Sequence, residues 1–173
     1  AQDNAENQED FLRRIRAILP ETKYEDVKIR ILQKMAEYED DESVPVIMEQ
    51  LDSEQQPTVV TAAARALAAI GSPAADPAKP QLLAVLPNAP TGARAAVVWA
   101  LAVLGESAAS DAIIEEFSSG RLQGQPGFDP RVISDVLGPE RLSSNDLLNH
   151  DETSVRTLTA AALAETGTPD VID

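Results

Sequence analysis

The residues best suited to acid–base chemistry gather around His150, the only histidine in the chain. Asp146 and Asp151 stand close to it, and Ser143 and Ser144 precede it by a few positions. A nucleophilic triad needs a serine, a histidine and an acid that separate elements bring together. Here the three residue types crowd one helix end and its turn, where Ser, Asn and Asp commonly act as caps. We therefore expect a solvated helix–helix turn at this place rather than a catalytic site.

Clusters of carboxylates are the second feature that could support chemistry. The run Glu39–Glu42 lacks the spaced acids and central glycine of a calcium loop, and acids at the start of a helix are favoured by the helix dipole. Glu115 and Glu116 are adjacent, so on a helix they point about 100° apart and do not converge as an acid–base pair. The chain has no cysteine, which excludes disulfides, thiolate metal ligands and cysteine nucleophiles. We expect no catalytic, cofactor-binding or metal-binding residue, and infer that the protein is not an enzyme.

A binding surface fits the remaining residues better than an active site. Trp99 is the only tryptophan, and Trp and Arg are the residue types that dominate binding hot spots. We expect Trp99 and Arg65 to be neighbours in a groove that binds a protein partner of unknown identity. The alternative is that Trp99 packs between helices, under Arg65 in a cation–π contact. The candidate groove residues are Gln33, Thr61, Arg65, Ala95, Trp99 and Thr157.

An irregular segment, Ser118–Pro130, interrupts the helical pattern and contains three glycines and two prolines. Insertions in repeat arrays often map to a binding face, and the alternative is a tolerated surface insertion. We expect Phe128 to tuck the end of this segment onto the helices.

A recurring glycine defines the elements that position these residues. Gly71, Gly105, Gly138 and Gly167 are separated by 34, 33 and 29 residues, and a weaker copy places Glu39 at the glycine position. This period, combined with helical patterning, indicates stacked helix pairs. An apolar residue stands four positions before the glycine position in the clearest copies: Met35, Leu67, Leu101 and Leu163.

The repeats predict an all-α fold, a right-handed superhelical solenoid of about five helix pairs in one domain, 8–173. The pairs cover about 8–39, 40–71, 72–105, 106–138 and 139–167, with the start of a further repeat at 168–173. In the poorest copy only Asp129–Leu137 is helical in pattern. Projected on the second helix of each pair, the positions six and ten before the glycine lie away from the core. These positions supply the candidate groove residues.

The segment Pro57–Gly71 (PTVVTAAARALAAIG), followed by Ser72 and Pro73, resembles the bacterial HEAT-like repeats first described in phycobilisome lyases. Lys28, Arg94 and Arg156 stand at the basic position of that repeat. The resemblance implies that the second helices line the concave surface, and it is nearly silent about function. We expect a noncatalytic protein-binding or scaffolding module. A lyase-type subunit that holds a chromophore or client protein, and a structural spacer, remain the alternatives.

The charge and the composition of the chain limit the classes of partner that it can bind. The net charge is −15, and residues 1–56 carry 15 acids against 7 bases. Nucleic-acid binding needs clustered Lys and Arg side chains. The only such cluster in the sequence is Arg13, Arg14 and Arg16, so we expect no nucleic-acid partner. No apolar run has the length of a membrane span, so we expect no membrane insertion.

The two ends of the sequence carry further expectations. Residues 1–7 are polar and begin Ala1-Gln2 without a methionine, as mature exported proteins commonly do. We expect a disordered segment there and a periplasmic or secreted bacterial protein, with a cytoplasmic one as the alternative. The end, Gly167–Asp173, matches the start of another repeat, so we expect further repeats or end-to-end self-association.

Overall fold

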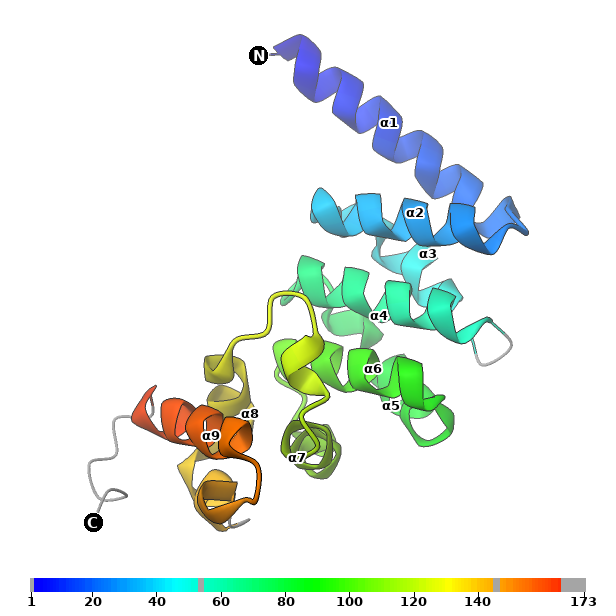
Figure 1. Ribbon diagram of the computed structural model, residues 1–173. Helices are drawn as coiled ribbons and strands as arrows, with labels where there is room; N and C mark the ends of the chain where they lie inside the picture. Colours follow the sequence, from blue (N-terminus) through cyan, green and yellow to red (C-terminus); the bar gives the residue numbers. More distant parts are fainter. Residues whose placement is uncertain (1, 53–54, 145–146, 166–173) are drawn as a thin grey trace.

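The computed structural model describes residues 2–52, 55–144 and 147–165, and within these ranges the chain is helical and has no strand (Figure 1). The all-α solenoid expected from the repeats is confirmed. Short 3-10 turns flank several of the helices. The helices are α1 (Gln2–Glu21), α2 (Glu25–Glu37), α3 (Val44–Met48), α4 (Pro57–Ile70), α5 (Lys79–Val85), α6 (Thr91–Val103), α7 (Ser110–Ser118), α8 (Pro130–Ser144) and α9 (Thr153–Glu165).

The second helices of the first three pairs, α2, α4 and α6, lie side by side in one layer (Figure 1). The helices α3 and α5 lie behind them and connect one second helix to the next. This arrangement follows from the sequence because each second helix has an apolar stripe at helical spacing that only its neighbours can cover. The residues four before the glycine position, Met35, Leu67, Leu101 and Leu163, are all buried.

The glycine positions end the second helices through a backbone conformation with positive φ. Gly71, Gly105 and Gly138 have φ of 73°, 71° and 70°, and Glu39, at the same position of the first repeat, has φ of 48°. At Glu39 the amide of Asp40 donates to the carbonyl of Met35, and at Gly105 the amide of Glu106 donates to that of Leu101. These hydrogen bonds satisfy carbonyls left over at the helix end. Glu39 therefore ends its helix with the positive φ that glycine adopts in the later repeats.

Gly138 divides α8 between two repeats. Its φ of 70° and ψ of 164° are not helical, and Pro139 follows it. Residues before it form the short second helix of the fourth pair. Residues after it form the first helix of the fifth pair, whose second helix is α9. The poor helical pattern before Gly138 corresponds to a short helix.

The N-terminal segment differs from expectation. Residues 2–7, which the sequence analysis expects to be disordered, are the first turns of α1. Extending a helix that is already nucleated costs little, and Glu6 is favoured near its positive end. The other terminal prediction, on Gly167 and residues 168–173, lies outside the described residues.

Stacking changes between the third and fourth pairs. Direct packing between α6 and α8 is slight, and α8 packs mainly on α9. Residues 119–129, here called the 119–129 loop, run alongside α6 from the end of α7 to the start of α8 (Figure 1). The insertion thus packs on α6 through the turn Leu122–Gly124.

Candidate functional site

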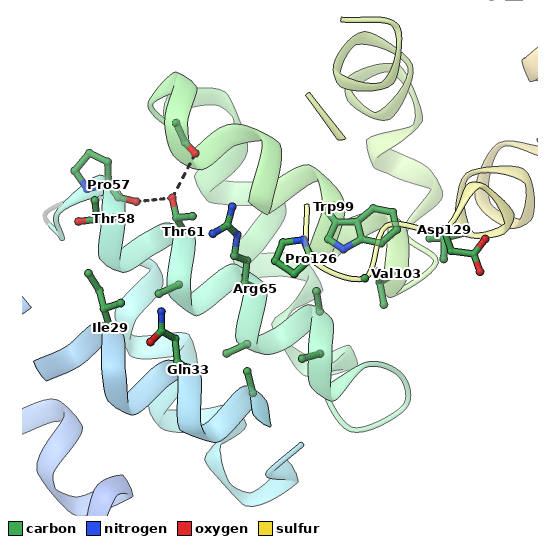
Figure 2. A pocket seen from close by; sticks show the side chains of 18 residues that line it. Ile29, Gln33, Pro57, Thr58, Thr61, Arg65, Trp99, Val103, Pro126 and Asp129 are labelled. Carbon is green, nitrogen blue, oxygen red and sulfur yellow. Dashed lines mark hydrogen bonds between the residues drawn. The ribbon is translucent and has the colours of Figure 1, made fainter. Parts of the chain in front are cut away.

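A groove of about 940 Å³ lies across the layer of second helices. Its walls come from α2, α4 and α6, and the 119–129 loop with the start of α8 closes one end (Figure 2). Small side chains of α4 line much of it, among them Ala62, Ala66 and Ala69, because this helix is rich in alanine. The remaining lining residues are Ile29, Gln33, Ala36, Pro57, Thr58, Thr61, Arg65, Ala68, Gly92, Trp99, Val103, Pro126, Gly127, Asp129 and Val132.

Four of the six predicted groove residues line this groove: Gln33, Thr61, Arg65 and Trp99. Ala95 is buried inside α6, with an exposed fraction of 5%. Thr157 is exposed on α9, where its hydroxyl donates to the carbonyl of Thr153 at 2.9 Å. The predicted residues of α2 and α4 therefore line the groove, and of the two predicted in α6 only Trp99 does.

Trp99 lines the groove as a buried residue, with an exposed fraction of only 2%. Of the two interpretations of Trp99, its burial agrees with packing and not with an accessible side chain. Its indole packs on the ring of Phe128, with ring centroids 5.4 Å apart, and Phe128 ties the loop to the core as expected. The sequence contained a signal for this burial: residues 95–104 are all apolar, and a helix that is apolar all round is covered on every side.

Arg65 lies exposed in the groove, between Thr61 and Pro126 (Figure 2). Its Nε donates to Oε1 of Gln125 at 3.2 Å, which links α4 to the 119–129 loop. The aromatic partner of Trp99 is Phe128, so the predicted pairing of Trp99 with Arg65 is replaced by two separate contacts to the loop.

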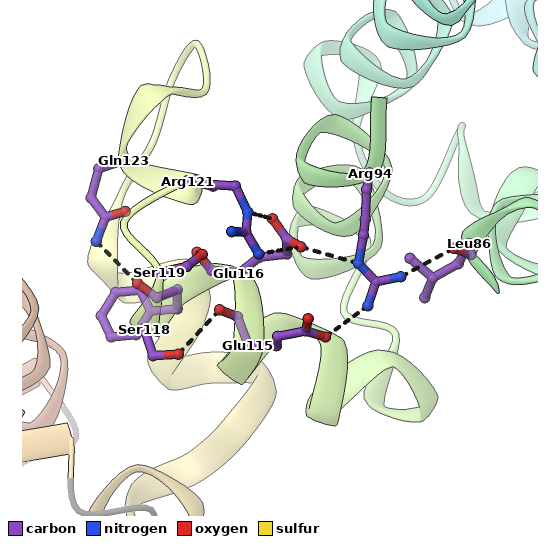
Figure 3. A network of polar contacts seen from close by, with 9 residues as sticks. Leu86, Arg94, Glu115, Glu116, Ser118, Ser119, Arg121 and Gln123 are labelled. Atoms are coloured by element: carbon purple, nitrogen blue, oxygen red, sulfur yellow. Dashed lines mark hydrogen bonds and ion pairs between the residues drawn. The ribbon is translucent and has the colours of Figure 1, made fainter. Parts of the chain in front are cut away.

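A buried carboxylate anchors the base of the 119–129 loop (Figure 3). The side chain of Glu116 is fully buried, and Arg94 Nε and Arg121 Nε donate to its two oxygens at 3.1 and 2.6 Å. Arg94 also donates to Glu115 and to the carbonyl of Leu86. The hydrogen bond to Glu116 raises the pKa of Arg121 above its ordinary value. Adjacent acids thus converge on one arginine, because Arg94 reaches both of them from α6.

No pattern in the sequence predicts this network, although Arg94 stands at the basic position of the repeat. The equivalent residues have similar roles. Lys28 Nζ donates to Gln50 and Gln55 at 2.9 and 3.0 Å. Arg156 donates to the carbonyls of His150 and Asp151. The basic position therefore fastens the second helix to neighbouring turns.

The other chemical candidates form structural contacts. His150 Nδ1 accepts a hydrogen bond from the amide of Glu152 at 3.2 Å, as in a turn. Asp146, its suggested acid, lies outside the described residues. In the described ranges no group of three or more acids and histidines is arranged to hold a metal ion. Among the same residues, no helix combines the length and apolar character of a membrane span.

The acidic run at residues 39–42 is explained by an ion pair. Arg16 on α1 donates to both oxygens of Asp40, at 2.8 and 2.6 Å, and Ser43 donates to Asp40 as well. Burial opposes the charge on Asp40, but these hydrogen bonds outweigh it, and the pKa of Asp40 lies below its ordinary value of 3.8. Asp40 therefore holds α1 against the turn that precedes α3.

The arginines predicted as the only basic cluster are all paired with acids. Arg13 and Arg14 both bind Asp10 on their own helix, and Arg16 binds Asp40.

Comparison of the sequence with known proteins identifies the family of this chain. No curated protein sequence matches the chain. Residues 12–102 match the family described as HEAT repeats, which commonly mediate protein–protein interaction and are generally noncatalytic. The matched region contains α2, α4 and most of α6, the helices that form the groove, and it covers more than half of the sequence. With this match and the stacked helix pairs, the chain belongs to the HEAT repeat family.

Proposed function

We propose that this protein is a noncatalytic protein-binding module and that the groove across α2, α4 and α6 binds its partner. The observation that carries the proposal is the lining of the groove: Ala62, Ala66, Ala69 and Pro126 form an apolar surface, and polar groups stand at a few places. Apolar grooves with a few polar groups are typical of sites that bind a peptide segment. A structural spacer requires no such surface.

The charges of the chain favour a protein over a nucleic acid. The net charge is −15, and Arg13, Arg14 and Arg16 are engaged by acids. A phosphate backbone needs free, clustered cations to displace its counterions.

Selection of a phage-displayed library of random 16-residue peptides on the intact protein tests the proposal. Ala69 is exposed in the groove, so Ala69→Arg fills it with a long side chain without touching the core. We expect enriched peptides whose affinity falls at least about tenfold on Ala69→Arg, since a clash at a packed interface costs more than 1.4 kcal/mol.

The matched control is Ala17→Arg, at an exposed alanine of α1 outside the groove. This variant should bind the enriched peptides as the wild type does. If no peptide is enriched, or if the enriched peptides bind Ala69→Arg and wild type alike, the groove is not a binding surface.

A further inference from the structure

The groove contains one basic residue, Arg65, and one acidic residue, Asp129. Asp129 is engaged in its own helix, since its Oδ1 accepts a hydrogen bond from the amide of Arg131 at 2.9 Å at the start of α8. Arg65 has a single neutral partner, Gln125, and pairs with no carboxylate of the described residues. The chain has 29 acidic and 14 basic residues. Even so, among the described residues no carboxylate forms an ion pair with Arg65 in this largely apolar groove.

The geometry around Arg65 leaves the end of its guanidinium available. Gln125 takes the Nε hydrogen, so the two Nη atoms have no protein partner among the described residues. Much of the neighbouring surface is supplied by Ala62, Ala66, Ala69 and Pro126, whose side chains carry no acceptor. The polar neighbour, Thr61, directs its hydroxyl to the carbonyl of Pro57 at 2.8 Å. Two parallel N–H groups match the two oxygens of a carboxylate.

From this arrangement we propose that the partner segment is apolar and carries one carboxylate, an Asp or Glu side chain or a chain end, that pairs with Arg65. This inference rests on the proposed function. A segment that covers the groove excludes water from the guanidinium, and the ion pair gains strength as the surroundings lose water. Arg65 is then the residue that fixes the position of the segment.

The charge of the whole chain limits the number of acids in that segment. At a net charge of −15 the protein repels an acidic peptide over a Debye length of about 8 Å. The segment should therefore carry its single carboxylate at Arg65 and neutral or basic residues elsewhere.

The test uses the enriched phage peptides as synthetic probes on the intact protein. Each probe is compared with a version in which its Asp or Glu is changed to Asn or Gln, or its terminal carboxylate to an amide. We expect the amide version to bind wild type at least tenfold more weakly. On Arg65→Gln both versions should bind with the same reduced affinity.

Two further variants sharpen the test. Arg65→Lys keeps the charge but loses the paired N–H groups, so it should recover only part of the affinity. Selection on Arg65→Glu should enrich peptides with Lys or Arg in place of the acid.

The outcomes separate the inference from the proposed function. If probes lose binding on Ala69→Arg and yet bind wild type equally well as carboxylate or as amide, the result overturns the inference and leaves the groove as a binding surface. The amide comparison on wild type needs no variant, so it decides the matter even if a substitution at Arg65 disturbs folding.

Discussion

At the scale of single residues, Glu39 shows how the repeat tolerates a substitution at its most constrained position. Its φ of 48° costs a non-glycine residue about 1–2 kcal/mol, and its side chain is exposed. Glu39→Gly should therefore raise the free energy of unfolding by roughly 0.5–1 kcal/mol, after the greater entropy of glycine in the unfolded chain is counted. Chemical denaturation measures this.

The matched control for Glu39→Gly is Arg30→Gly, at an exposed position inside α2. Glycine there should lower stability by about 1 kcal/mol. Equal losses at both sites would contradict the role given to Glu39.

The ion pair of Arg16 with Asp40 predicts acid sensitivity. Because the pKa of Asp40 is lowered in the folded protein, its contribution is complete above the ordinary value of 3.8 and is lost as the pH falls through the folded pKa. Asp40→Asn should lower the free energy of unfolding at pH 6. Between pH 4 and pH 2, values chosen around the ordinary carboxyl pKa of about 3.9, the stability of this variant should fall less steeply than that of the wild type. Urea denaturation across this range measures both effects.

Asp135→Asn is the control for this pH dependence, since Asp135 is exposed on α8. It should leave both the stability and its pH dependence close to those of the wild type. An Asp40→Asn profile parallel to the wild type would exclude the ion pair as a source of acid sensitivity.

At the scale of elements, Glu116 joins three parts of the chain: α6 through Arg94, its own helix α7, and the 119–129 loop through Arg121. Glu116→Ala should lower stability by about 1–3 kcal/mol. The loss is moderate for a buried ion pair because both arginines are partly exposed and can turn to water. Thermal denaturation gives the size of the loss.

The loop should report the same change through Trp99. In Glu116→Ala the loop loses an anchor, so acrylamide should quench Trp99 fluorescence more strongly than in the wild type, where the indole is buried. Glu115→Ala removes a neighbouring exposed carboxylate and should change quenching little. Unchanged quenching in Glu116→Ala would show that other contacts, such as Phe128 with Trp99 and Gln125 with Arg65, hold the loop without Glu116.

The second helices were predictable because each repeats a local pattern. The recurring glycine position and the apolar residue four positions earlier are visible in the sequence, as is the basic residue near the start of α2, α6 and α9. The covering of α6 by the loop depends on Phe128 and Pro126, more than 20 residues beyond Trp99, and no local periodicity encodes that contact. The pairing of Arg94 with Glu116 spans 22 residues for the same reason.

At the scale of the whole molecule, the position of a repeat in the array should decide what a core substitution does. Leu101, in the middle of the stack, is fully buried. Leu101→Asp buries a charge without a partner and should cost more than about 4 kcal/mol. Leu163→Asp, in the last described helix, should unfold α9 and leave the first three pairs helical, since each repeat contacts only its neighbours.

Circular dichroism during thermal unfolding distinguishes these two variants. Leu101→Asp should lose most of its helical signal at a temperature where Leu163→Asp keeps the larger part. Leu101→Met, which conserves volume, should cost less than about 1.5 kcal/mol. Equal loss of helix in both aspartate variants would show that the array unfolds as one unit.

The groove itself was predictable in part. Gln33, Thr61 and Arg65 follow from projection of helices whose outer face is polar. Trp99 was placed in the right location, and of its two interpretations the structure agrees with packing. The projection alone left the exposure open, because it treats every second helix as having a solvent face. The apolar character of α6 on all sides indicates that one of them does not.

Direct packing of second helices gives way, at one place in the array, to the 119–129 loop. Cooperativity spreads through contacts between neighbouring repeats, so this junction should divide the native state into two units of opening. In deuterated buffer, amides of α8 and α9 should exchange through a partial opening that leaves α2 and α4 protected. Mass spectrometry of peptic fragments would then show two groups of rates with a boundary at the loop, whereas one common rate would mean that the loop transmits opening as well as packed helices do.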